Sequence, residues 1–193
     1  MKLRKLTTII LAPQICFAAG IDLNYLNPYL EQCSNQNAHP NTMKAIIKTE
    51  SGGNPFALNL NGKKNGKRIK LAKQPKNIEQ AKAWATFLEQ NNYNFDVGVA
   101  QVNIRNIHKY GYTAAEALDL CVNLKMASFI LKKNYHQALY KSTNQQDAVK
   151  MAISAYNTGN YRNGFYNGYV SKVLTNSKKV QIAQLQQPTV SSY

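Results

Sequence analysis

The sequence predicts a mainly helical protein with a single domain. Apolar residues recur at the three- and four-residue spacing of an α-helix in several segments, and no internal repeat is visible. A chain of 193 residues is long enough for one domain with a sizeable core and too short for two comfortable ones. The hydrophobic fraction of 44%, with 12 Tyr and 6 Phe, is typical of a globular protein and argues against wholesale disorder.

The predicted elements follow one another along the chain with few gaps. We expect helices over residues 41–50, 77–90, 113–119, 122–140 and 147–157, and a final helix that begins near Tyr169. Asp147 is expected to cap the helix that it begins. An irregular or hairpin excursion over 56–72 is expected to turn at Asn61 and Gly62, and residues 91–106 should form a loop followed by a short element.

The N-terminal segment has the layout of a secretory signal. Lys2, Arg4 and Lys5 form a basic region, and a mainly apolar stretch follows over residues 6–17. A buried amphipathic helix is the alternative, although the stretch lacks helical alternation. The stretch is also shorter than the roughly 20 residues that a membrane span requires. We therefore expect residues 1–19 to be a signal peptide, and the exported protein to carry no transmembrane anchor after cleavage.

Two further boundaries follow from composition. Residues 20–180 should form the folded domain, and the polar segment 181–193 should be a flexible tail. Cleavage of the signal would remove Cys16 and leave Cys33 and Cys121. An even number of thiols in an exported protein suggests one disulfide, with two unpaired buried thiols as the alternative.

The excess positive charge of the chain favours binding to polyanions. The formal net charge is +15, and loss of the signal's three cations leaves +12. Outside the cytoplasm, the candidate polyanions are carboxylate-bearing cell-wall peptides, anionic lipid headgroups and nucleic acid. The densest basic run, residues 61–73, is better explained as a solvated loop or hairpin than as an element that reads a nucleic-acid groove.

Glu50 occupies a position where a helix normally places an apolar residue. Met43, Ile46 and Ile47 follow the i, i+3, i+4 spacing of an apolar face, and Glu50 stands at i+7. The run that follows, 51–55, ends the helix and opens a loop. The helix dipole and partial burial both disfavour a charged carboxylate there. A carboxyl group with a raised pKa can protonate the leaving oxygen of a glycosidic bond, although a solvated helix-end glutamate fits the same pattern.

A later helix repeats this arrangement. Val149, Ala152 and Ile153 are apolar at the same spacing, and Tyr156 takes the i+7 position just before Asn157. Two predicted helices therefore end by carrying a polar group inward.

Four stretches read together resemble a known family. They are "ESGGNPFALN" (50–59), "DVGVAQVN" (96–103), "AISAYNTGN" (152–160) and "YVSKV" (169–173). They resemble, in order, the motifs of lytic transglycosylases related to goose-type lysozyme, which carry the SLT domain. Within that family the chain is most similar to the small transglycosylases of type IV secretion systems. The resemblance covers roughly residues 33 to 174 and implies an α+β lysozyme-like fold with an active-site cleft.

The resemblance implies a role for each matched position. Glu50 corresponds to the single catalytic acid and base. The positions that would contact or shape the substrate are Ser51, Gly98, Gln101, Tyr156, Asn157 and Tyr169. In the family the glycine permits close backbone approach, the glutamine amide faces the saccharide, the phenol lies near the reacting centre, and the asparagine amide lies near the substrate's acetamido group. Cys33 and Cys121 fall where the secretion-associated members place cysteines, which supports the disulfide.

The implied reaction is cleavage of the bond between N-acetylmuramic acid and N-acetylglucosamine, with closure of a 1,6-anhydro ring. The implied partners are peptidoglycan glycan strands and type IV secretion components, with nucleic acid excluded as the primary ligand, and the implied location is the periplasm. Asp96 leaves a lysozyme-type hydrolase open, although a turn or capping role is the simpler explanation. A non-catalytic wall-binding assembly protein is a further alternative. No metal and no cofactor are expected, because the three histidines lack ligand spacing.

Overall fold

The computed structural model describes residues 22–34, 38–64 and 66–185. The expected signal peptide and the end of the expected tail, residues 186–193, lie outside the described residues. The helices of the described part are η1 (Leu23–Leu26), α1 (Asn27–Cys33), α2 (Pro40–Glu50), α3 (Ile78–Gln90), α4 (Ile104–Lys109), η2 (Glu116–Leu118), α5 (Leu120–Leu139), α6 (Gln145–Thr158), α7 (Asn163–Tyr166) and α8 (Tyr169–Leu185). The strands are β1 (Leu58–Leu60), β2 (Lys63–Lys64), β3 (Lys67–Arg68), β4 (Phe95–Val97) and β5 (Val102–Asn103). The predicted mainly helical fold is confirmed.

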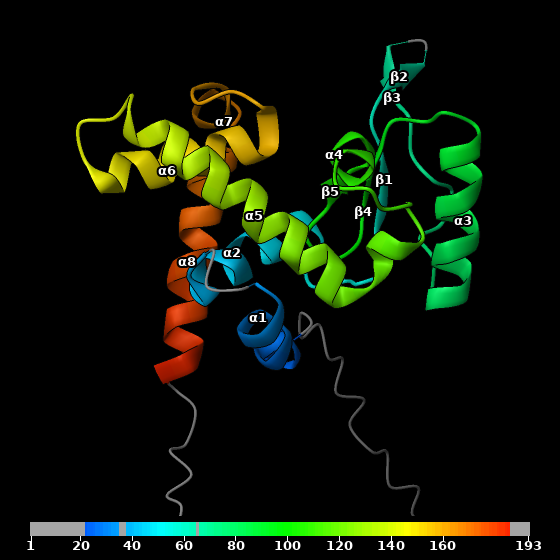
Figure 1. The fold of residues 1–193 in the computed structure, drawn as a ribbon, viewed down its shortest axis with the longest axis horizontal. Helices are drawn as coiled ribbons and strands as arrows, with labels where there is room; N and C mark the ends of the chain where they lie inside the picture. Colours follow the sequence, from blue (N-terminus) through cyan, green and yellow to red (C-terminus); the bar gives the residue numbers. More distant parts are fainter. Residues whose placement is uncertain (1–21, 35–37, 65, 186–193) are drawn as a thin grey trace, which may run out of the picture.

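The elements form a small sheet region and a helical region (Figure 1). The sheet has the order β1-β4-β5 with antiparallel neighbours, and α3 and α4 lie beside it. Helices α6, α7 and α8 lie on the other side of the molecule, and α5 runs between the two regions. Helix α2 lies near the centre, where it packs against α8.

Helix α2 carries much of the core, as its apolar spacing predicts. Met43, Ala45, Ile46 and Ile47 are completely buried. The helix begins at Pro40, whose missing N–H costs nothing at a first position, and the His39 side chain accepts a hydrogen bond from the Asn41 backbone N–H. Burial of each large apolar side chain contributes about 1.5–3 kcal/mol, so this helix fixes the position of its own C-terminal residue firmly.

The hairpin excursion is present, but its turn lies elsewhere than predicted. Strands β2 and β3 pair Lys63 with Arg68 and Lys64 with Lys67, so the chain reverses after Lys64 and not at Asn61 and Gly62. Within this segment Asn-Gly dipeptides stand at 61–62 and 65–66, and Gly66, from the second one, has a φ of +74° between the two strands. The first lies at the base of the hairpin, where the Ile69 N–H donates to the Gly62 carbonyl.

Two predictions about helices were wrong for identifiable reasons, and the last helix reaches past the expected start of the tail. Residues 113–119 form only the short η2, because Asp119 is extended and caps α5 by accepting from the Val122 N–H. Asn144, not Asp147, caps α6, since its side chain accepts from the Asp147 N–H. Helix α8 continues to Leu185, so the first residues of the expected tail are helical.

A disulfide between Cys33 and Cys121 joins the end of α1 to α5, as predicted. It spans 88 residues of sequence and ties the N-terminal helices to the central one. Among the described residues, we find no helix that combines the length and apolar character needed to cross a membrane.

Candidate active site

A cleft of about 1350 Å³ runs between the sheet region and the helical region. One wall comes from β1, the segment after β3, and the β4–α4 segment; the other comes from α5, α6 and the start of α8. The end of α2 contributes Glu50 to the lining. Of the residues matched to the family motifs, those that line this cleft are Glu50, Gln101, Tyr156, Asn157 and Tyr169.

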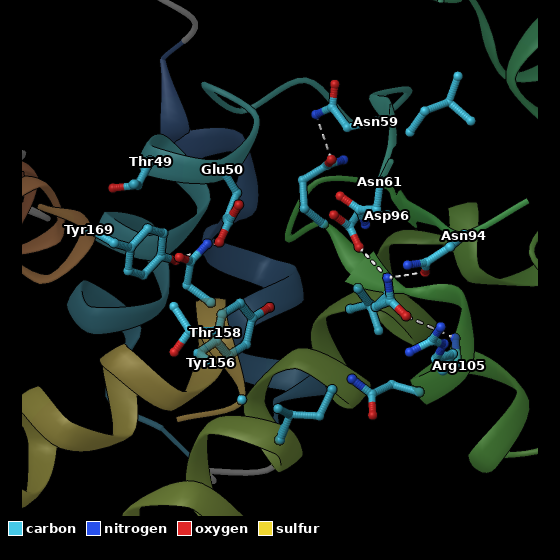
Figure 2. A pocket seen from close by; sticks show the side chains of 18 of the residues that line it. Thr49, Glu50, Asn59, Asn61, Asn94, Asp96, Arg105, Tyr156, Thr158 and Tyr169 are labelled. Carbon is cyan, nitrogen blue, oxygen red and sulfur yellow. Dashed lines mark hydrogen bonds between the residues drawn. The ribbon is translucent and has the colours of Figure 1, made fainter. Parts of the chain in front are cut away.

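Glu50 is the last residue of α2 and points into the cleft (Figure 2). The Tyr169 hydroxyl, from the first residue of α8, donates to Glu50 Oε1 at 2.5 Å. Burial raises the pKa of the Glu50 carboxyl to about 7. The Tyr169 hydrogen bond and the positive charge of Lys172 oppose this rise in pKa, whereas the negative charge of Asp96 adds to it. At neutral pH the carboxyl is therefore divided between its protonated and charged forms.

The turn after Glu50 is fixed by Ser51. Its hydroxyl donates to the Val99 carbonyl at 2.6 Å and accepts from the Gly53 N–H at 3.1 Å. Ser51 thereby ties the first motif to the second, but it does not line the cleft. The Tyr25 hydroxyl donates to the Gly53 carbonyl at 2.6 Å and secures the turn from the other side.

Gly98 lies behind the cleft wall, against a buried amide. Its φ of +78° suits glycine, and a Cβ atom there would lie 2.5 Å from the Asn123 side-chain nitrogen. The Asn123 amide donates to the Val97 and Ala117 carbonyls and accepts from the Ala100 N–H. Close approach of backbone to this amide explains the glycine.

Gln101 holds one wall of the cleft together. Its amide nitrogen donates to the Ala57 and Gly98 carbonyls at 3.0 and 2.8 Å. Its oxygen accepts from the Asn59 side chain at 2.7 Å, and a dashed line at Asn59 in Figure 2 marks this hydrogen bond. Gln101 also has a φ of +51°, unusual for a residue with a side chain. These protein contacts use both amide N–H groups, so the residue that Gln101 orients in the cleft is Asn59.

Tyr156 and Asn157 come from the end of α6, as the inward-facing pattern predicts. The Tyr156 hydroxyl donates to the Ala100 carbonyl at 2.8 Å, which joins α6 to the second motif. Burial raises the pKa of this phenol well above its ordinary value, so it is neutral and acts as a donor. Asn157 is exposed in the cleft, and its Oδ1 accepts from Asn167 at 3.1 Å.

Asp96 lies on β4, across the cleft from the end of α2 (Figure 2). Its Oδ1 accepts from the Asn103 side chain at 2.7 Å, and Asn103 also donates to Asn94 Oδ1. Asn59 and this asparagine pair were not singled out from the sequence, because no motif spacing marks them. Only the pairing of β4 with β1 and β5 brings them to one wall.

The described residues contain no group of three or more His, Cys, Asp or Glu side chains that could hold a metal ion. The polar groups of the cleft are instead amides, hydroxyls, cations and the two carboxyl groups named above. This set suits recognition of a polar chain with hydroxyl and amide groups, together with proton transfer by one acid of raised pKa.

Comparisons with known proteins identify the family of this chain. The model of the family described as "Transglycosylase SLT domain" matches residues 27–179. The chain is 40% identical over 153 residues to the type IV secretion system protein virB1 of Brucella abortus (strain 2308), which covers 76% of this chain and 61% of the relative. It is 31% identical over 178 residues to the protein virB1 of Agrobacterium fabrum (strain C58), which covers 90% of this chain and 69% of the relative.

The chain spans about three fifths of the length of the Brucella relatives it matches. No solved structure matches it significantly. The family model nevertheless includes all four motifs and both cysteines of the disulfide. Because the family model matches residues 27–179, the chain belongs to the transglycosylase SLT domain family.

Proposed function

We propose that this protein is a lytic transglycosylase that cleaves the β-1,4 bond between N-acetylmuramic acid and N-acetylglucosamine in peptidoglycan. The observation that carries the proposal is Glu50, an acid with a pKa raised to about 7 at the centre of a long polar cleft. A general acid works best when its pKa lies near the working pH. Membership of the SLT domain family supports the same reaction.

In the first step, protonated Glu50 gives its proton to the oxygen that links the two sugars. The bond from that oxygen to carbon 1 of the muramic acid breaks, and N-acetylglucosamine leaves with the new hydroxyl. The 2-acetamido oxygen of the substrate stabilises carbon 1, so no second protein carboxylate is required. Tyr169 stabilises the Glu50 carboxylate that this step produces, because its hydroxyl donates to Oε1.

In the second step, the Glu50 carboxylate removes the proton from the muramic 6-hydroxyl. The 6-oxygen then bonds to carbon 1, which displaces the acetamido oxygen and closes the 1,6-anhydro ring. Glu50 ends the cycle protonated, and no water enters the product. A pKa near 7 allows one group to serve first as the acid and then as the base.

The other cleft residues would position the sugar chain. Asn157 is exposed at the end of α6 and offers its amide to the substrate's acetamido group. Tyr156 lines the cleft near Glu50 and offers its hydroxyl oxygen as an acceptor. Gln101 would act through Asn59, whose amide it holds in the cleft. Ser51 and Gly98 would act by fixing the two turns that carry the motifs.

We also propose that the enzyme is exported to the periplasm and acts with a type IV secretion system. The name of the Brucella relative, a type IV secretion system protein, supports this setting. The disulfide supports an oxidising compartment outside the cytoplasm. Local opening of the wall would let an envelope-spanning apparatus assemble.

Mass spectrometry of muropeptides tests the reaction directly. Purified sacculi are incubated with the mature protein, with Glu50→Gln and with Glu79→Gln, which removes an exposed glutamate of α3 outside the cleft. We expect 1,6-anhydromuramic products from the wild type and Glu79→Gln, and none from Glu50→Gln.

The same experiment separates the alternatives. Products with reducing muramic ends would show a hydrolase, in which Asp96 positions water across the cleft from Glu50. Sacculus binding without any released product would favour a wall-binding assembly protein.

A further inference from the structure

The walls of the cleft are strongly basic. Among the described lining residues, the cations are Lys70, Lys73, Arg105, Lys133 and Lys172, whereas the carboxylates are only Glu50 and Asp96. Glu50 is also partly neutral near pH 7, because of its raised pKa. The positive excess of the whole chain is therefore concentrated, in part, around the proposed substrate.

These cations lie on both walls. Lys70 and Lys73 belong to the segment that leads from β3 to α3, and Arg105 belongs to α4. Lys133 and Lys172 belong to α5 and α8 on the opposite wall. All of them are exposed, and the charge of Lys172 reaches Glu50.

No ion pair within the described chain uses these cations. The ion pairs between described side chains are His108 with Glu89 and Lys150 with Asp147, and none of these four residues lines the cleft. The cleft cations are therefore available to an anionic ligand. They also repel one another, so an anion in the cleft would relieve an unfavourable charge distribution.

The sugar rings of peptidoglycan do not account for these charges. The rings carry hydroxyl and acetamido groups, which are neutral. The peptide stems branch sideways from the muramic acid residues and carry free carboxylates. Basic side chains on the walls, on both sides of the sugar path, are placed to meet such branches.

We propose, on the basis of the proposed function, that the cleft cations bind the carboxylates of the peptide stems. The enzyme then prefers glycan strands that carry stems over strands from which an amidase has removed them. Lys70 and Lys73 are the best test of this preference, because they lie on the far wall from α8 and do not influence Glu50.

The experiment compares two soluble substrates, uncrosslinked glycan strands with intact stems and the same strands after amidase treatment. The double variant Lys70→Ala/Lys73→Ala is compared with Lys76→Ala/Lys82→Ala, which removes the same charge from exposed positions outside the cleft. New anhydromuramic ends give kcat/KM for each pair, and circular dichroism confirms that both variants are folded.

We expect the cleft variant to lose about three- to tenfold in kcat/KM on the stem-bearing strands, because each exposed ion pair changes an equilibrium up to about fivefold. Its kcat/KM on stripped strands should match that of the control variant. The wild type's preference for stems should shrink at high salt, since exposed charges are screened.

Two results would overturn the proposal. An equal loss of kcat/KM on both substrates would mean that the cations bind the sugar chain, or the lactyl carboxylate that amidase treatment exposes, and not the stems. A cleft variant indistinguishable from the control would mean that Lys70 and Lys73 are solvated surface charges. If the wild type produces anhydromuramic ends from neither substrate, the proposed function itself would be refuted.

Discussion

The proposed acid should destabilise the fold at neutral pH, so its removal should stabilise the protein. The pKa of Glu50 is about 7 in the folded state, against an ordinary value of 4.5 for a glutamate carboxyl. A raised carboxyl pKa means that the folded state binds the proton more tightly than the unfolded state. The wild type therefore loses stability as pH rises from about 4.5 to about 7, and the loss is complete above that range. Glu50→Gln does not titrate and escapes this loss.

The size of the effect follows from the pKa difference. Each pKa unit corresponds to about 1.4 kcal/mol, which sets an upper limit of roughly 3 kcal/mol for the shift of Glu50. Glu50 is partly exposed to the cleft, which reduces the cost of its charge. We expect Glu50→Gln to raise the free energy of unfolding by about 1–3 kcal/mol near pH 8, or roughly 2–4 °C in Tm per kcal/mol.

Urea or thermal unfolding of the disulfide-intact protein measures this difference at several pH values. The gain should be largest near pH 8 and should approach zero near pH 4, where both states of the wild type are protonated. Glu79→Gln controls for the removal of a glutamate at an exposed site. A gain that does not change with pH, or a Glu50→Gln variant less stable than the wild type near pH 8, would refute the burial of Glu50 as the source of its raised pKa.

Tyr169→Phe removes a hydrogen bond that favours the charged form of Glu50, so the pKa of Glu50 should rise further. The alkaline limb of the pH–rate profile should shift to higher pH by as much as about one pH unit. A shift to lower pH would contradict the role of Tyr169 as a hydrogen-bond donor to the Glu50 carboxylate. Gly98→Ala should lower the free energy of unfolding by roughly 2–4 kcal/mol in urea titrations, because the new methyl group meets the Asn123 amide. Gly52→Ala, with a similar φ and open space around it, should cost only about 1 kcal/mol. Replacement of both disulfide cysteines by serine should cost about 2–5 kcal/mol, measured by thermal unfolding against the oxidised protein.

Local sequence patterns predicted an element correctly where only one structure fitted the pattern. Helix α2 was predicted within one residue at its start, because its apolar spacing and Pro40 agree. The 113–119 segment has helical composition, yet Asp119 serves the following helix as a cap and must be extended. The hairpin turn was misplaced because two Asn-Gly dipeptides compete, and only the pairing of β2 with β3 distinguishes them.

The candidate site was predicted in part, for the same physical reason. Glu50 and Tyr156 interrupt apolar faces, and such interruptions are visible in one sequence. The bond from Asn59 to Gln101 spans 42 residues and depends on the pairing of β1 with β4. The excess of cations in the cleft likewise depends on how distant segments meet, since composition alone gave only the total charge.

The contact of α8 with the end of α2 sets the time at which the site is completed during folding. The Tyr169 hydroxyl that holds Glu50 comes from a residue 119 positions later, and Asn176 donates to Thr49 across 127 positions. A chain that emerges from its N-terminus exposes Glu50 long before Tyr169 exists to orient it. The assembled site therefore appears only after the last helix has docked. A chain that ends before residue 169 lacks the hydroxyl that orients Glu50, so we expect it to have little transglycosylase activity. Incomplete chains would then not degrade the cell wall.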